Sequence, residues 1–301
     1  MAQNLPGGYN GKVLRVDLTN GKATTEQIDD PFCRKYLGGT GFIAYYLLRE
    51  LKGGIDPLGV ENKLVFAMGP LTGLTLGGCA RHAVGAKSPL TGGIAKSEVG
   101  EYWGAQFKRA GFDVLIIEGK AENPVYLWIH NGDVEIKDAG HLWGKNTKDT
   151  QGLIRSELDD SKVRLAMIGP GGENLVKYAC LMHGPFDAAG RGGLGAVMGA
   201  KNIKAVAVRG DNMPAISNSG GVKKMVSWLK ENMDLVKVFS DFGTGLPMPT
   251  FERVGNLPIR NFREGGFPNV DKMSAETLKN TIGLGMEGCF ACPVRCKKVV
   301  E

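Results

Sequence analysis

Apolar and polar positions alternate in short runs through the first two thirds of the chain. Residues 14–18 alternate in this way, which predicts a half-buried strand. Asn20–Gly21 follows, so residues 22–28 are predicted to complete a hairpin with a two-residue turn. The same pattern returns at 125–137. Continuous apolar runs predict further strands at 63–68, 113–118, 163–168 and 203–208.

Helical segments are predicted between these strands. Asp30 is the predicted N-cap of a helix with Pro31 in its first turn. The pair Gly38–Gly39 interrupts this helix before it resumes at 42–51. Further helices are predicted at 100–110 and 147–158. Strands and helices mixed in this order predict an α+β fold with mixed sheets. The repeated hairpin indicates either a duplicated α+β unit or two unrelated hairpins.

A change in composition marks the predicted domain boundary. Residues 211–221 are rich in Pro, Ser, Gly and Asn, as is typical of a linker. We therefore predict an α+β domain at 1–211 and the start of a mostly helical domain at 212–301. Helices are predicted there at 222–238 and 274–282. We expect this short second domain to be incomplete and to leave apolar surface exposed.

Composition and charge narrow the class of protein. The chain is 43% hydrophobic and 23% charged, as in soluble globular proteins. Its net charge of +6 is spread without a basic block, which argues against nucleic-acid binding and suits an acidic electron-transfer partner or a phosphate-bearing cofactor. We predict no signal peptide and no membrane span. The six cysteines do not resemble a secreted disulfide framework, so we expect a reducing cytoplasm.

Three cysteines near the end of the sequence form the most chemically specific motif. Cys289, Cys292 and Cys296 have the spacing C-x2-C-x3-C. Iron–sulfur clusters need several thiolates on one tightly turning segment, usually with four in total. Zinc also binds Cys-x-x-Cys, but such sites usually add a second cysteine pair or histidines. The motif therefore predicts an iron–sulfur cluster, with zinc or redox-active thiols as alternatives.

Glycine-rich segments at 69–81, 87–100 and 188–199 could bring the backbone close to an anionic ligand. Backbone amides in such loops, with a nearby arginine, are suited to phosphate. The third segment also contains the pattern G-x-G-x-x-G, but no strand of a βαβ unit is predicted to lead directly into it. Each segment alone is more typical of a structural turn. Together they favour a large phosphate-bearing ligand.

These loops and cysteines together resemble a known family. The segments that carry the resemblance are 13–19, 69–73, 87–92, 168–175, 189–205 and the cysteine motif. The set resembles the tungsten-dependent aldehyde:ferredoxin oxidoreductase family over essentially the whole chain. The resemblance implies tungsten or molybdenum held between two pterins on the N-terminal domain. It also implies a magnesium ion that bridges the pterin phosphates, and a [4Fe–4S] cluster that passes electrons to ferredoxin.

The resemblance also implies roles for particular residues. Arg81 would bind a pterin phosphate, and the pterins would be contacted by Gly100, Gly190 and Arg191. Backbone carbonyls of Ala188 and Glu98 would hold magnesium, although the family pattern has Asn in place of Glu98. Asp187 stands where the family can carry a basic residue, and its carboxylate would repel phosphate.

Family members continue for about the same length again, and that later half carries the fourth cysteine and the acid/base residues. We therefore assign no catalytic residue and expect the isolated chain to be inactive alone. We expect the histidines to be structural or at the surface, namely His82, His130, His141 and His183.

The resemblance implies oxidation of aldehydes to carboxylic acids. The alternatives are a subunit of a reductase for benzoyl-CoA-type thioesters and a non-catalytic electron-transfer or cofactor-binding fragment that needs a partner chain. A nicotinamide-dependent enzyme is a weaker alternative. An oligomer or a complex with a second polypeptide is expected.

Overall fold

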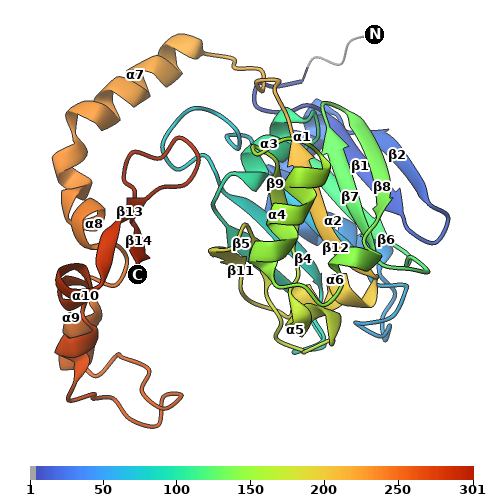
Figure 1. The fold of residues 1–301 in the computed structure, drawn as a ribbon. Coiled ribbons are helices and arrows are strands. Elements are labelled where there is room, and N and C mark those ends of the chain that lie inside the picture. Colours follow the sequence, from blue (N-terminus) through green and yellow to red (C-terminus); the bar gives the residue numbers. More distant parts are fainter. Residues whose placement is uncertain (1–4) are drawn as a thin grey trace. The chain divides into compact units, whose positions relative to one another are not determined.

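The computed structural model describes residues 5–301, which divide into two units (Figure 1). The first unit comprises the residues up to Thr75 together with Cys79–Ser217, and the second comprises Leu76–Gly78 with Asn218–Glu301. Two six-stranded mixed sheets with helices form the first unit. This architecture confirms the predicted α+β fold class.

The first sheet has the strand order β2-β1-β6-β3-β4-β5. Strand β1 pairs antiparallel with β2 and parallel with β6. Strands β3, β4 and β5 continue from β6 as an antiparallel meander. The bounds are β1 Lys12–Asp17, β2 Lys22–Gln27, β3 Leu64–Met68, β4 His82–Lys87, β5 Ile94–Val99 and β6 Val114–Glu118.

The second sheet has the order β11-β10-β9-β12-β7-β8 and repeats the plan of the first. Its hairpin β7–β8 corresponds to β1–β2, and β7 pairs parallel with β12 as β1 does with β6. The meander β9–β10–β11 corresponds to β3–β4–β5. The bounds are β7 Val125–His130, β8 Asp133–Asp138, β9 Arg164–Met167, β10 Leu181–His183, β11 Asp187–Ala189 and β12 Ile203–Arg209. This shared topology favours the duplicated unit over two unrelated hairpins.

Side chains alternate between two cores because successive residues of a strand face opposite sides of a sheet. In β3, Leu64, Phe66 and Met68 join the core shared by both sheets, whereas Val65 and Ala67 join a separate outer core. Both faces of the strand are therefore buried, which explains its continuous apolar sequence. Each of these side chains except that of Ala67 contributes about 1.5–3 kcal/mol by leaving water.

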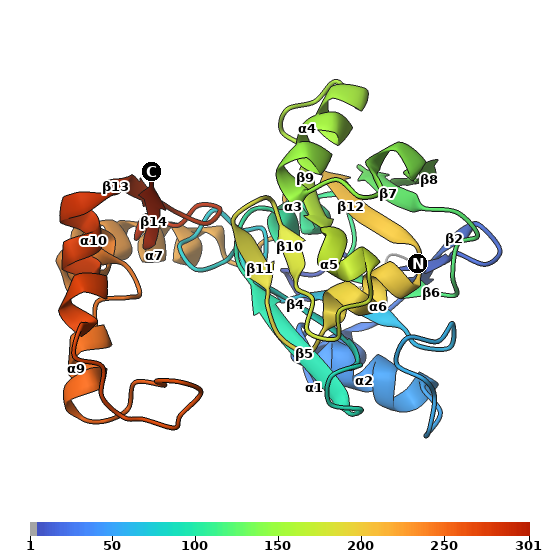
Figure 2. The same cartoon turned by 60° about the horizontal axis from the view of Figure 1, so that its bottom comes forward.

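Helices complete the layers of the first unit (Figure 2). Helices α1 (Asp30–Tyr36) and α2 (Thr40–Glu50) pack on the outer face of the first sheet. Helix α4 (Thr147–Glu157) packs on the outer face of the second sheet. Helices α3 (Trp103–Arg109) and α6 (Leu194–Ala200) contribute to the shared core. Two short helical segments are η1 Gly140–Leu142 and α5 Pro170–Glu173.

The first predicted helix needs a correction of one residue at its start. The carboxylate of Asp29, not Asp30, accepts from the Phe32 amide at 2.9 Å and caps α1. The interruption predicted at Gly38–Gly39 is confirmed. Gly38 has a φ of +121°, and an added Cβ would lie 2.5 Å from the Met68 carbonyl oxygen, so the chain reversal between α1 and α2 requires glycine there.

The second unit consists of short helices and one hairpin. Its elements are α7 Ser219–Glu231, η2 Met233–Val236, α8 Lys237–Phe242, α9 Met248–Arg253, η3 Val270–Met273, α10 Ala275–Thr281, β13 Gly283–Glu287 and β14 Lys297–Val300. The helix predicted at 222–238 breaks at Asn232, whose side-chain amide donates to the Trp228 carbonyl at 2.8 Å. Within residues 218–301 only Gly243, Val270, Ser274 and Ala275 are buried. This sparse burial agrees with the predicted exposure of apolar surface.

Candidate functional site

Three of the predicted site residues lie at one end of the β4–β5 hairpin. His82 pairs with Val99, so Arg81 and Gly100 flank the last rung of this ladder. Arg81 and Glu98 are both exposed. A hydrogen bond from Lys96 lowers the pKa of the Glu98 carboxyl, and the charge of Arg81 lowers it further. The structure therefore places Arg81 and Glu98 within electrostatic reach of each other.

The first glycine-rich segment is fixed to Arg81 through a threonine. The Thr72 hydroxyl donates to the Arg81 carbonyl at 2.7 Å and accepts from the Gly69 amide at 2.9 Å. These two hydrogen bonds hold the backbone at Arg81 while its side chain stays exposed. A guanidinium presented in this way is suited to a phosphate group.

The other three predicted residues lie on or just after β11. Ala188 pairs with Met182 of β10, and Gly190 and Arg191 follow at the surface. Strand β11 lies beside β5, so this edge is next to the edge that carries Glu98 (Figure 2). The six residues thus come from two neighbouring hairpins, β4–β5 and β10–β11, which occupy corresponding places in the two halves of the duplicated fold.

The second and third glycine-rich segments pack directly on each other. The Ser88 hydroxyl donates to the Gly192 carbonyl at 2.8 Å. An added Cβ on Gly192, whose φ is +80°, would lie 2.7 Å from the Ala95 Cβ of β5. Glycine is therefore needed for this close approach. The result is an exposed edge with two arginines and closely packed backbone, which fits the chemistry of a large phosphate-bearing group.

Carboxylates near this edge set a limit on where an anion could lie. Glu101 follows Gly100 and is buried, and this burial raises the pKa of its carboxyl. The Asp187 charge raises it further, while the Trp103 amide, a hydrogen-bond donor at 2.8 Å, opposes the shift. Asp187 therefore lies within electrostatic range of Glu101, and an anion would be repelled on that side.

Two histidines meet beneath the same edge. His82 of β4 and His183 of β10 are buried, and their Nε2 atoms lie 3.0 Å apart. The sequence predicts both as structural, and their burial agrees with that prediction. His141 is exposed, as predicted, and its Nε2 lies 3.5 Å from a Glu157 carboxylate oxygen. The His130 ring stacks on the Trp128 ring, with 5.4 Å between the ring centroids.

The cysteine motif lies on the loop between β13 and β14. Cys289, Cys292 and Cys296 are each partly buried, and the Cys292 amide donates to the Cys289 carbonyl at 3.0 Å. Ala291 and Arg295, each directly before a cysteine, have φ values of +52° and +50°. Such left-handed residues tighten the loop between the thiols. Thiolates on one short turning segment have the chemistry that an iron–sulfur cluster needs.

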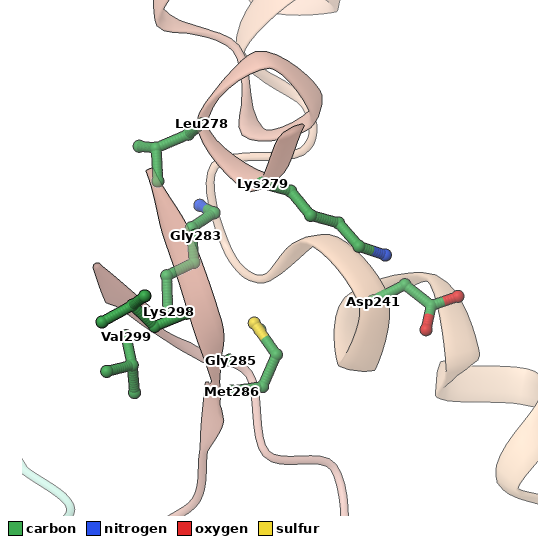
Figure 3. A pocket seen from close by; sticks show the side chains of 9 residues that line it. Asp241, Leu278, Lys279, Gly283, Gly285, Met286, Lys298 and Val299 are labelled. Atoms are coloured by element: carbon green, nitrogen blue, oxygen red, sulfur yellow. The ribbon is translucent and has the colours of Figure 1, made fainter. Parts of the chain in front are cut away.

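The thiols are not brought together as a finished metal site. Across residues 5–301, no three His, Cys, Asp or Glu side chains are grouped closely enough to hold a metal ion. The cysteine ligands therefore remain a prediction. Residues of the same hairpin line a cavity of about 260 Å³, where the Lys279 side chain extends from α10 towards Asp241 and Met286 projects from β13 (Figure 3).

The strands that carry the candidate site are the part that sequence reasoning missed. No strand was predicted at β4, β5, β10 or β11, and β5 lies within a segment that was described only as a glycine-rich loop. The β13–β14 hairpin was also not expected. The glycine-rich fingerprint at 190–195 does follow a strand, but β11 pairs antiparallel with β10 and does not neighbour β12. A nucleotide-binding βαβ unit is therefore not present at this position, which removes the basis of the nicotinamide alternative.

Comparison with known proteins places this chain in a class of oxidoreductases. Residues 13–210 match the family model of the aldehyde ferredoxin oxidoreductase N-terminal domain, and residues 221–301 match that of its domains 2 and 3. The chain belongs to the aldehyde ferredoxin oxidoreductase family. Within residues 5–301, no helix has the length and apolar character that crossing a membrane requires.

Individual relatives agree with this assignment. The tungsten-containing aldehyde ferredoxin oxidoreductase of Pyrococcus abyssi is 43% identical over 97% of this chain and 49% of its own length. The aliphatic sulfonate oxidoreductase WOR-like subunit of Pyrococcus furiosus is 34% identical over the same shares. A solved structure of the active site complex BamBC of benzoyl coenzyme A reductase with 1,5-dienoyl-CoA matches with a TM-score of 0.83 and 32% identity, over 98% of this chain and 47% of that chain. The chain thus spans about half the length of these relatives.

Proposed function

We propose that this chain is the cofactor-binding N-terminal portion of a tungsten or molybdenum bis-pterin oxidoreductase. Its reaction would convert an aldehyde and water to a carboxylic acid, two protons and two electrons, with the electrons passing to ferredoxin. The observation that carries the proposal is the pair of neighbouring hairpins that present Arg81 and Arg191 on closely packed glycine-rich backbone. Family membership and the tungsten-containing relatives support the identity of the cofactor.

The predicted residues have the following roles in this proposal. Arg81 binds one pterin phosphate, and Gly100, Gly190 and Arg191 contact the pterins. Backbone carbonyls of Ala188 and Glu98 hold the bridging magnesium ion, a role that does not depend on the Glu98 side chain. The bound metal supplies the two-electron chemistry at the aldehyde carbon. The protein orients the cofactor through these contacts and keeps the phosphates paired with cations.

The electron exit is assigned to the cysteine loop of the second unit. Cys289, Cys292 and Cys296 would supply three ligands of a [4Fe–4S] cluster, and the fourth would come from protein beyond these residues. The tight turns at Ala291 and Arg295 support this role because they keep the thiols on one short loop. We propose domains at 1–211 and 212–301, a cytoplasmic location and an electron-transfer partner such as ferredoxin.

A second candidate reaction is favoured by one specific comparison. The similarity to the solved benzoyl coenzyme A reductase complex supports a subunit that reduces aromatic acyl-CoA thioesters on the same scaffold. The residues of the two hairpins bind the cofactor in either case, so they do not distinguish between the two substrates. The choice depends on residues that line the substrate pocket.

Metal analysis of the purified protein, expressed anaerobically with tungstate, tests the proposal. We expect tungsten or molybdenum together with iron and sulfide. An Arg81→Ala variant should lose most of its tungsten, whereas Arg34→Ala, an exposed arginine on α1, should retain it. Iron without tungsten would support an electron-transfer fragment, and zinc alone would contradict both. Activity of the complete enzyme that contains this chain, measured with aldehydes against benzoyl-CoA analogues and a low-potential dye, separates the two reactions.

A further inference from the structure

The buried histidine pair joins the two halves of the cofactor-binding edge. His82 is the first residue of β4 and directly follows Arg81. His183 is the last residue of β10 and pairs with Asp187 at the start of β11, the strand that carries Ala188. The hydrogen bond between the two rings, with 3.0 Å between Nε2 atoms, therefore connects the strand beside Arg81 to the strand pair beside Ala188.

The surroundings of the pair keep both rings uncharged. Burial, and then the nearby His183, lower the pKa of His82 well below 6.5. Burial lowers the pKa of His183 to about 3, with the Leu181 backbone carbonyl acting weakly in the opposite direction. The Trp103 ring also contacts both histidines, with ring centroids 4.9 Å and 5.7 Å away. The indole that packs on both histidines is thus an uncharged neighbour.

Each ring of a neutral histidine pair carries one proton, because a neutral imidazole donates from one nitrogen and accepts at the other. In the Nε2–Nε2 hydrogen bond one ring therefore donates and the other accepts. Neither Nδ1 atom makes a hydrogen bond of good geometry to the described residues, so the Nε2 contact is the polar anchor of both rings.

A glycine on α3 leaves room for the His82 ring. An added Cβ on Gly104 would lie 2.6 Å from His82 Nδ1 and 3.0 Å from its Cγ. Helical residues do not need glycine for their backbone conformation, and glycine weakens a helix relative to alanine. The close approach of the imidazole explains why this position is glycine. The ring is therefore held by the helix on one side and by His183 on the other.

We propose that His82 and His183 are positioning residues whose single hydrogen bond fixes the spacing between the Arg81 edge and the Ala188 edge, and so the spacing between the two phosphates that the site binds. The proposal rests on the proposed function, because it assumes that these edges bind phosphates. The pair touches no ligand itself. It acts by holding β4 and β10 at a fixed separation. These two strands occupy corresponding positions in the two halves of the duplicated fold.

The test measures binding of inorganic pyrophosphate with Mg²⁺ to the full chain without cofactor, by isothermal titration calorimetry. We expect His82→Leu to weaken binding about tenfold, because His183 Nε2 then lacks its hydrogen-bond partner and the two edges lose this buried tie between them. His82→Gln should restore binding, since a side-chain amide can either donate to or accept from His183 Nε2. Ile154→Ala, a buried change on α4 outside the edge, should lower the melting temperature but leave the affinity unchanged.

The outcomes separate the two proposals. If the original protein binds Mg²⁺-pyrophosphate and His82→Leu binds it equally well, the positioning role is wrong and the proposed function is unaffected. Equal loss in His82→Leu, His82→Gln and Ile154→Ala would also contradict the positioning role, because binding would then follow stability alone. If the original protein and Arg81→Ala bind equally poorly, the proposed phosphate edge is wrong, and the role of the pair is wrong with it.

Discussion

A buried ion pair at the centre of the first unit gives the strongest prediction about stability. The Lys108 and Asp113 side chains are completely buried and form a direct ion pair. The Asp113 carboxylate also accepts from the backbone amides of Asn10 at 2.9 Å and Gly11 at 2.6 Å. In Asp113→Asn, one acceptor oxygen becomes an amide that faces other donors, and the Lys108 ammonium loses its counter-charge.

The expected loss follows from the burial of both groups. Removing one partner of a buried ion pair typically costs about 3–5 kcal/mol, because the remaining charge is left without compensation. The whole stability of a domain is only about 5–15 kcal/mol, so this loss is a large fraction of it. Lys108→Met should cost less than Asp113→Asn. In Lys108→Met the carboxylate keeps its amide donors, whereas in Asp113→Asn the ammonium loses its counter-charge and keeps two neutral partners, the Gly69 carbonyl at 3.4 Å and the Tyr9 ring with its centroid at 5.2 Å. The double variant should cost less than the sum of the two.

Urea unfolding monitored by tryptophan fluorescence measures these differences. The chain has four tryptophans, and a Trp228→Phe background leaves the remaining ones in the first unit. The control is Lys237→Ala, which removes an exposed ion pair with Asp241 and should leave unfolding of the first unit unchanged. A change below about 1 kcal/mol in Asp113→Asn would refute the reasoning, since it would mean that the buried charge is not uncompensated.

Three further predictions test other parts of the structure. Gly104→Ala should lower the melting temperature despite its better helix propensity, because its Cβ would lie 2.6 Å from His82 Nδ1; an unchanged or raised value by calorimetry would contradict the tight packing. Burial lowers the pKa of Lys201 to about 8 from 10.5, so the unfolded chain holds this proton at pH values where the folded one releases it. Stability relative to Lys201→Met should therefore rise by on the order of 3 kcal/mol between pH 8 and 10.5, and a flat difference in urea titrations would refute the shift. The exposed Trp228 and Phe239 of the second unit should make the chain bind a hydrophobic dye or self-associate, less so in Phe239→Ser, whereas a compact monomer without dye fluorescence would contradict this.

The fold was predictable wherever burial imposed a simple pattern. The apolar runs at 63–68 and 113–118 became β3 and β6, which are buried on both faces. The hairpins at Asn20–Gly21 and Asn131–Gly132 were predictable because their turn residues favour left-handed backbone, and Gly21, Asn131 and Gly132 do have positive φ values. The local sequence alone was sufficient to predict these strands and hairpins.

The site strands escaped prediction because their sequences serve close packing. Strand β4 reads His-Ala-Val-Gly-Ala-Lys, with few of the β-branched and aromatic residues that mark a strand. Its Gly85 is needed because an added Cβ would lie 2.5 Å from Ile43 of α2. Strand β11 has only three residues, so it shows no periodicity at all. Small residues at close contacts in β4, and the shortness of β11, thus hid strands that present the site.

The duplicated topology gives the strands that were not predicted a common role. Hairpins β4–β5 and β10–β11 correspond to each other, and each ends beside residues that the proposal assigns to phosphate binding. A ligand with two similar halves would meet two similar edges, so the distance between the edges matters more than any single contact. A rigid polar tie between them is effective because the apolar core alone would allow small sliding of the sheets, whereas a hydrogen bond at 3.0 Å tolerates little change in length. The buried position of His82 and His183 is therefore where a constraint on spacing acts most directly.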